Sequence, residues 1–262
     1  MTAPTVASFS HATLAFGDRV LFDDLNLSIE AGEFVAVLGP NGSGKTSFLR
    51  TLLGQYPLTA GRLTVTGAVG YIPQQHADDA DAMALRARDL VGFGVDGDRW
   101  GIGLRGHRER RRKVDAALAE VGASAYADAP VGMLSGGEQQ RLRVAQALTT
   151  DPQLLLCDEP LASLDPASQE RVVELIDRRR RTAATSVVLV THEINPVMPY
   201  VDRVLYLVGG EFLAGPPAAV MTTETLSELY GSHVEVVRVN GRILVVGGEE
   251  GTAHCDASEG HR

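Results

Sequence analysis

A glycine-rich segment carries the residue types and spacing most suited to chemistry in this chain. Glycines let a backbone curl so that its N–H groups face an anion, and a helix that starts behind them adds a positive dipole end. At the spacing G-x-x-x-x-G-K-[ST], Lys45 can reach the β- and γ-phosphates of a nucleotide and the Thr46 hydroxyl can bind Mg²⁺. The predicted phosphate cradle is Gly39-Pro40-Asn41-Gly42-Ser43-Gly44-Lys45-Thr46-Ser47.

Two adjacent carboxylates, Asp158 and Glu159, follow the apolar run 154–157. Such a run indicates a buried strand, and α/β sheets bind ligands at the carboxyl ends of their strands. Asp158 therefore suits the role of the magnesium partner in phosphoryl-transfer sites. Glu159 remains free to polarise the attacking water as a general base. The alternative is a solvated Asp-Glu pair that simply ends a strand.

A third segment, 134–141, reads LSGGEQQR. Ser135 is placed to cap a helix that starts near Glu138, and Gly136 and Gly137 leave backbone N–H groups open to an anion. Taken locally, this pattern predicts a helix N-cap and nothing more.

The elements around these segments indicate an α/β fold. Residues 35–38 form an apolar run that ends at the glycine loop, and Phe48, Leu49, Leu52 and Leu53 follow at helical spacing. Strands are predicted within 5–38, 62–72 and at 153–157, 186–190 and 203–207. Helices are predicted at 138–148 and 170–181. This alternation predicts a sheet that is parallel in its core.

Two regions depart from that alternation. Residues 76–133 are rich in Ala, Arg, Asp and Gly, with helical spacing over 110–122, so we expect a mainly helical insertion. Near the C-terminus we expect a short helix at 226–230. A hairpin should follow, with strands at 234–239 and 242–246 joined by Asn240-Gly241. The polar composition of 248–262 predicts a disordered tail.

Composition and charge limit the function classes. A net charge of −9 and a pI near 5.3 argue against a sequence-independent nucleic-acid binder. Basic residues nevertheless cluster at 99–113 and 178–181, which we interpret as solvated helix faces. Of the two cysteines, Cys157 is expected in the core and Cys255 in the tail, a usage that fits a reducing cytoplasm. No secretory signal and no apolar run of about 20 residues is visible, so we expect a soluble chain that docks onto membrane proteins.

Together these segments resemble the ABC ATPase family, for which LSGGEQQR is the signature motif. The resemblance covers roughly residues 5–246. It implies that Phe16 stacks on adenine and that Gln74, in 71–74, links the magnesium site to a membrane subunit. It also makes Ser163-Leu164-Asp165 the D-loop and lets His192 contact the γ-phosphate. Locally, Phe16 could be core, Gln74 a surface residue and His192 structural, while Ser163 and Asp165 could cap a helix before Pro166.

The resemblance also implies an architecture and an assembly. It predicts a P-loop NTPase core with a mainly parallel sheet, an antiparallel β subdomain and a helical subdomain at about 76–150. One domain would span 1–247 and end in a helix and hairpin at about 222–247. Two copies would pair head to tail, with ATP between the glycine loop of one and residues 135–137 of the other. Glu138 and Asp165 would flank that shared site, and Thr46, Asp158 and Gln74 would hold Mg²⁺.

Residues 191–207 and 225–231, with the hairpin after them, resemble the zinc/manganese importer branch of the family. The implied partners are integral membrane permease subunits and, indirectly, an extracytoplasmic substrate-binding protein, without nucleic acid. The implied location is the cytoplasmic face of the plasma (inner) membrane. Ferric-siderophore or cobalamin import is the nearest alternative, and a soluble ABC regulator without transport is another. The tail holds the zinc-ligand types His254, Cys255, Asp256 and His261, at a spacing that matches no closed site.

Overall fold

A six-stranded sheet forms the centre of the molecule. The computed structural model describes residues 3–74, 83–96 and 107–247. The strand order is β5-β6-β7-β3-β8-β9, parallel except for the last pair. The strands are β3 Phe34–Leu38, β5 Val69–Ile72, β6 Leu154–Asp158, β7 Ser186–Val190, β8 Arg203–Val208 and β9 Glu211–Gly215. The predicted α/β architecture with a parallel core is therefore confirmed.

The sheet is covered on both faces, which explains why its central strands are apolar without alternation. Every residue of β3, β6 and β7 is buried. Their side chains divide between two hydrophobic clusters: Phe34 and Leu38 of β3 belong to one, and Val35 and Val37 to the other. The first cluster packs on helices α5 Gly136–Leu148 and α6 Pro166–Ala183, and the second on helix α1 Lys45–Leu52.

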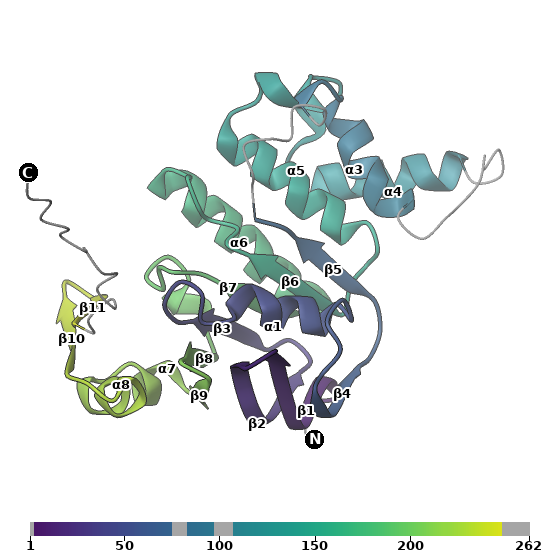
Figure 1. Ribbon diagram of the computed structural model, residues 1–262. Helices are drawn as coiled ribbons and strands as arrows, with labels where there is room; N and C mark the ends of the chain where they lie inside the picture. Colours follow the sequence, from purple (N-terminus) through teal and green to yellow (C-terminus); the bar gives the residue numbers. More distant parts are fainter. Residues whose placement is uncertain (1–2, 75–82, 97–106, 248–262) are drawn as a thin grey trace, which may run out of the picture.

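A separate antiparallel sheet covers the α1 side. It contains β1 Thr5–Phe16, β2 Arg19–Glu30 and β4 Ala60–Val65 in the order β2-β1-β4, and Figure 1 shows it below α1. Three buried phenylalanines join it to the helix. Phe9 stacks on Phe48 of α1 with ring centroids 5.1 Å apart, and Phe22 meets both rings edge-on. This sheet corresponds to the antiparallel part that was expected.

The helices of the predicted insertion gather at the top of the molecule in Figure 1. They are α3 Ala87–Asp96, α4 His107–Glu120 and α5, with 3₁₀ turns at Ser124–Tyr126 and Val131–Met133. Helix α5 starts at Gly136, two residues before the predicted start, because Ser135 and Glu138 form a reciprocal capping box. Residues 76–82 and 97–106, including Arg99 and Arg105, lie outside the described residues.

Helix α6 also starts earlier than predicted, at Pro166 rather than at residue 170. The Asp165 side chain accepts a hydrogen bond from the Ser168 N–H, and Pro166 occupies the first turn, where it removes no helical hydrogen bond. Near the C-terminal end of α6, Arg179 and Arg180 have side chains only 13% and 15% exposed and are ion-paired. The solvated-face interpretation of residues 178–181 is therefore wrong for these two arginines, because neighbouring carboxylates surround them.

The C-terminal elements follow β9. They are α7 Pro217–Val220, α8 Thr223–Tyr230, β10 Val234–Val239 and β11 Arg242–Gly247. The predicted hairpin is confirmed, and Asn240 and Gly241 both have positive φ, as a tight turn of this type requires. Residues 248–262, with Cys255 and the other tail residues, lie outside the described part. In the part of the chain that the structure describes, no helix has both the length and the apolar character needed to cross a bilayer.

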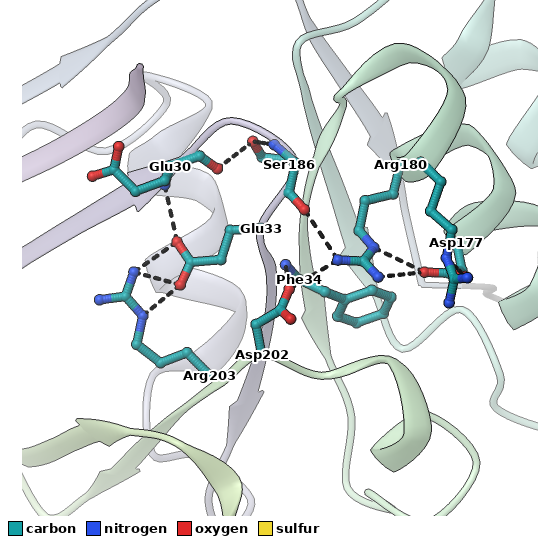
Figure 2. Close-up of polar contacts among 10 residues, drawn as sticks. Glu30, Glu33, Phe34, Asp177, Arg180, Ser186, Asp202 and Arg203 are labelled. Atoms are coloured by element: carbon teal, nitrogen blue, oxygen red, sulfur yellow. Dashed lines mark hydrogen bonds and ion pairs between the residues drawn. The ribbon is translucent and has the colours of Figure 1, made fainter. Parts of the chain in front are cut away.

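A polar cluster ties the two sheets together at the end opposite the glycine loop (Figure 2). The Arg203 guanidinium donates from Nε and Nη2 to the two carboxylate oxygens of Glu33, at 2.7 and 2.6 Å. It also donates to the Ser28 carbonyl at 2.6 Å. Asp202 accepts from the Phe34 N–H and from Arg180, both at 2.9 Å. The turn between β2 and β3 is thus bonded to the start of β8 through Arg203. Arg180 links the same region to the end of α6.

We expect Arg203→Met to lower the free energy of unfolding by about 2–3 kcal/mol, because it leaves the Glu33 carboxylate, only 13% exposed, without its bidentate partner. Urea denaturation followed by circular dichroism measures this change. The control is Arg111→Met, which removes an exposed ion pair with Asp115 on α4 and should cost at most about 0.5 kcal/mol. Equal losses in the two variants would contradict this role of the Glu33–Arg203 pair.

Candidate functional site

The parallel sheet brings the predicted site residues to one edge. Adjacent strands β5, β6, β7 and β3 end, in that order, at Ile72, Asp158, Val190 and Leu38. The chain that leaves these strands carries Gln74, Glu159, His192 and the glycine loop, respectively. Residues more than 100 positions apart therefore meet because parallel strands present their carboxyl ends on the same side.

The glycine loop folds around the Lys45 side chain. Its Nζ donates to the carbonyls of Gly39 and Pro40 at 2.8 and 2.9 Å, and the residue is 6% exposed. A Cβ at Gly39, where φ is +142°, would lie 2.1 Å from the Leu207 carbonyl oxygen, so only glycine fits. The buried Ser43 hydroxyl has no hydrogen-bond partner among the described residues. Such a loop, with an unsatisfied hydroxyl and a helix N-terminus behind it, suits a bound anion.

A cavity of about 380 Å³ opens beside this loop. Six of the nine residues of the predicted phosphate cradle contribute to its wall, together with Phe16, Gln74 and Glu159, whereas Asp158 and His192 do not line it. The lining residues are Phe16, Arg19, Leu21, Asn41, Gly42, Gly44, Lys45, Thr46, Ser47, Gln74 and Glu159.

The two carboxylates differ in their surroundings. Asp158 is 2% exposed, and its Oδ1 accepts a hydrogen bond from the Thr46 hydroxyl at 3.2 Å. Glu159 pairs with His192 across 2.6 Å, between Oε2 and Nδ1. Its backbone has φ of +48°, a left-handed conformation that is strained for a non-glycine residue. The strained turn directs Glu159 into the cavity while Asp158 stays buried beneath Thr46.

Burial and charge act together on the ionisable groups. Burial lowers the pKa of the Lys45 ammonium, and the nearby Glu159 and Asp158 carboxylates oppose that shift. Burial raises the pKa of the Asp158 carboxyl; the hydrogen bond from Thr46 opposes this, and the charge of Glu159 adds to it. Burial, followed by the charge of Asp158, raises the pKa of the Tyr71 hydroxyl to about 12. A cation beside Asp158 would favour its ionised form, so these groups suit an anion and a cation bound together.

Phe16 stands at the rim of the cavity. It is 47% exposed, so it is not the core residue that one interpretation allowed. Its ring meets Tyr56 edge-on, with centroids 5.1 Å apart and an interplanar angle of 78°. An exposed ring held by a neighbouring ring can accept a flat aromatic group on its face.

The predicted residues of the LSGGEQQR segment lie elsewhere. Ser135, Gly136, Gly137 and Glu138 begin helix α5, which lies above α1 in Figure 1, and they do not line the cavity. The Glu138 carboxylate accepts hydrogen bonds from the backbone N–H and the hydroxyl of Ser135, both at 2.8 Å, which lowers its pKa. Asp165 is likewise occupied in capping α6. One chain therefore holds two separate groups of predicted site residues.

Three residues of the site were not predicted: Arg19, Leu21 and Tyr71. Arg19 lines the cavity and donates to the Gly42 carbonyl, although no motif marks it. The Tyr71 hydroxyl contacts Asp158 Oδ2 at 3.5 Å. The only available signal was the position of Tyr71 at the end of a predicted strand, which gives its place along the sheet but not its partner.

Comparison with known proteins identifies the family. The profile described as "ABC transporter" matches residues 22–162. An aliphatic sulfonates import ATP-binding protein of Pseudomonas fluorescens is 41% identical over 76% of this chain and 72% of its own length. A zinc import ATP-binding protein of Cereibacter sphaeroides is 34% identical over 87% of this chain and 89% of its own length. Other relatives carry the names of phosphonate, hemin, manganese and iron(3+)-hydroxamate import or transport proteins.

Solved structures agree on the fold. A chain of a transporter assigned to the metal-chelate type, in an inward-facing conformation, has a TM-score of 0.79 at 25% identity and covers 92% of this chain and 96% of its own. A dimeric ATP-binding cassette bound to ADP and Pi has a TM-score of 0.67 at 26% identity, over 80% of this chain and 98% of its own.

The names of these relatives agree on the type of subunit and differ in the cargo. The profile match covers more than half of the chain, and residues of the glycine loop share one cavity with Gln74 and Glu159. This chain belongs to the ABC transporter family, as the ATP-binding and ATP-hydrolysing subunit of an importer.

Proposed function

We propose that this subunit binds MgATP, hydrolyses it as a head-to-tail homodimer, and drives the import of a divalent metal ion, zinc or manganese. One observation carries the proposal. The glycine loop, Asp158, Glu159, Gln74 and His192 converge on one edge of the parallel sheet, whereas residues 135–137 begin a helix elsewhere on the same chain. Such an arrangement calls for a second chain to complete each nucleotide site.

In this proposal the glycine loop binds the phosphates. The backbone N–H groups of 41–47 and the Lys45 ammonium surround them, with Lys45 exchanging its two carbonyl partners for phosphate oxygens. The Ser43 hydroxyl, buried without a partner among the described residues, donates to the same anion. Phe16, exposed at the rim, stacks on adenine.

The donor set beside the loop suits Mg²⁺. Thr46 Oγ1 and Asp158 Oδ1 lie 3.2 Å apart, and Gln74 lines the same cavity. Hydroxyl, carboxylate and amide oxygens are the hard ligands that Mg²⁺ prefers. When bound, the ion neutralises charge on the phosphate oxygens. Asp158 is held under Thr46 by its burial and its hydrogen bond, so the residue is already oriented before a ligand arrives.

Glu159 is the proposed general base. Its side chain lines the cavity and is only 14% exposed. His192 Nδ1 lies 2.6 Å from its Oε2. The carboxylate can accept a proton from the attacking water, and His192 can then contact the γ-phosphate from the neighbouring strand end. Strain at the Glu159 backbone is consistent with a position kept for function rather than for stability.

The residues at the starts of α5 and α6 would complete the nucleotide site of the second copy. Ser135, Gly136 and Gly137 present a capped helix N-terminus, which attracts anions, and Asp165 and Glu138 flank it. Closure of two chains around ATP would assemble the site and convert binding energy into motion. We further propose one ABC ATPase domain over 1–247, with the helical subdomain at about 76–150 and the C-terminal helix and hairpin at about 222–247.

The membrane side of the proposal rests on family membership. Permease subunits would dock near Gln74 and the 83–100 segment at the cytoplasmic face of the inner membrane, without nucleic acid. A substrate-binding protein outside the membrane would take part indirectly. The metal assignment is supported by the zinc and manganese relatives and by the fold of the metal-chelate-type transporter, and it competes with sulfonate and phosphonate cargo.

Glu159→Gln should keep ATP binding and lower the ATPase kcat by roughly 10²-fold or more, because the amide cannot accept the proton of water. Steady-state hydrolysis and equilibrium binding of a fluorescent ATP analogue measure the two effects. The control Glu211→Gln, at an exposed position on β9, should leave both unchanged. Near-normal turnover in Glu159→Gln would refute the role of base.

Mixing two inactive variants tests the shared site. Lys45→Ala removes the phosphate ligand, and Gly136→Asp places a negative charge at the α5 N-terminus. A Cβ at Gly136 lies an ordinary 3.6 Å from Leu164, so this change should not prevent folding. A mixed dimer then contains one intact composite site, so an equimolar mixture should recover up to about a quarter of the normal rate. Recovery of no activity would argue against the head-to-tail site.

Elemental analysis of metal-starved source cells tests the cargo. Cells that carry the Glu159→Gln variant in place of the normal chain should hold less zinc or manganese, because an importer without turnover cannot accumulate its ion. Loss of iron or cobalt would instead indicate siderophore or cobalamin cargo. Unchanged metal content, with the ATPase defect confirmed in the purified protein, would contradict metal import.

A further inference from the structure

The C-terminal hairpin is attached to the rest of the molecule along both of its edges. On the β10 edge, the Ser227 hydroxyl of α8 donates to the Val234 carbonyl at 3.1 Å and accepts from the Val234 N–H at 3.0 Å. Thr223 of α8 accepts from the Val236 N–H at 2.9 Å. The β11 edge has a different kind of attachment, to the chain that follows β7.

That attachment is the side chain of Asn195. Its Nδ2 donates to the Ile243 carbonyl at 2.9 Å, and its Oδ1 accepts from the Ile243 N–H at 2.7 Å. The amide therefore pairs with Ile243 as a neighbouring strand would, and it satisfies both backbone groups on an otherwise open edge. Ile243 is buried at 5% exposure, so these two bonds are shielded from competing water.

Asn195 lies three residues after His192, in the same short loop. The loop is anchored in the core by Ile194, which is 6% exposed, and two side-chain contacts add to this anchor. Before it, the Thr191 hydroxyl donates to the Glu193 carbonyl at 2.9 Å and accepts from the Glu193 N–H at 3.1 Å. After it, Asn195 holds β11. His192 itself is 62% exposed, so packing does little to hold it, and its 2.6 Å contact with Glu159 depends on the path of the loop.

Cavities lie on both sides of the Asn195 contact. One of about 390 Å³ is lined by Gly39, His192 and Asn195 on the core side and by Ile243 to Val245 on the hairpin side. Another, of about 430 Å³, is lined by Asn195 and Pro196 and by Gly241 and Arg242 of the hairpin. The hairpin and the loop are thus not packed continuously, and the Asn195 amide bridges them between two open spaces.

We propose that Asn195 is a positioning residue for hydrolysis. It fastens the His192 loop to the C-terminal hairpin, so that the hairpin acts as a fixed support for the His192–Glu159 pair. The inference rests on the proposed roles of Glu159 and His192 and extends them to an element that contacts neither residue through a hydrogen bond. The hairpin thereby contributes to ATP turnover and not only to the stability of the fold.

A purely structural role would make a different prediction. If the hairpin only adds stability, loosening it from α8 or from the His192 loop should have the same effect. Ser227 offers the matched comparison, because it also makes two side-chain hydrogen bonds to the backbone of one hairpin residue, on the other strand.

The experiment uses the full chain and four variants: Asn195→Ala, Ser227→Ala, His192→Ala, and Asn195→Ala combined with His192→Ala. The measurements are kcat and KM for MgATP and the midpoint of thermal unfolding. We expect Asn195→Ala to lower kcat by roughly tenfold, since a misplaced group costs rate even when it is retained. KM should stay within about twofold. Both Asn195→Ala and Ser227→Ala should lower the melting temperature by a few degrees, but Ser227→Ala should keep the normal kcat.

The decisive comparison is between the kcat of the double variant and the kcat of His192→Ala. If Asn195 acts through His192, the Asn195 change should cause no further loss once His192 is absent. Additive losses, or an equal loss in Ser227→Ala, would overturn the inference. Normal kcat in Asn195→Ala with a loss in His192→Ala would overturn it while leaving the proposed function standing. Normal kcat in His192→Ala would instead refute the role of His192 itself.

Asn195→Asp covers the case in which Asn195→Ala does not fold. The carboxylate can still accept from the Ile243 N–H but cannot donate to the Ile243 carbonyl. We expect a smaller fall in kcat that again disappears in the His192→Ala background, and a kcat equal to that of the unmodified chain would count against the inference.

Discussion

Burial of three adjacent parallel strands is the constraint on which the rest of the structure depends. Strands β3, β6 and β7 have no exposed residue, so each must be covered on both faces, and their direction and order cannot change without exposing apolar side chains. Because they run parallel, the polar residues that follow them leave the sheet at one edge. The nucleotide site is therefore a consequence of how the core is packed, and its precision comes from the rigidity of that core.

The two ends of the sheet carry different kinds of polar groups. At one end, Arg203 and Glu33 satisfy each other, and Asp202 is bonded to Arg180 and to a backbone N–H, so this end stabilises the fold (Figure 2). At the other end, within the part of the chain that the structure describes, Lys45 donates hydrogen bonds only to carbonyls of its own loop and the Ser43 hydroxyl has no partner. Polar groups that are buried and incompletely satisfied are costly, which is why their concentration at one edge indicates a ligand site.

The distribution of motifs over the molecule explains why the chain is expected to act in pairs. The glycine loop and Glu159 share a cavity, but the capped start of α5 belongs to a different part of the same chain. A second copy can bring the two together, and the movement needed to do so is available for work on a membrane partner. The C-terminal hairpin enters this scheme through Asn195, which connects a late and otherwise peripheral element to the loop that carries His192.

The sequence by itself determined the nucleotide motifs, the alternation of strands and helices in the parallel core, and the hairpin turn at Asn240-Gly241, but it did not predict β9 or α7. The predicted features depend on local physics: glycine conformations, helix caps and continuous apolar runs leave a signal within a few residues. Helix starts were displaced by two to four residues, because Ser135 and Asp165 cap the chain earlier than the apolar periodicity indicates. Only the tertiary structure decided which distant residues meet. The pair of Arg180 with Asp202, the contact of Tyr71 with Asp158 and the pairing of Asn195 with Ile243 join residues 22 to 87 positions apart, and no local pattern encodes such contacts.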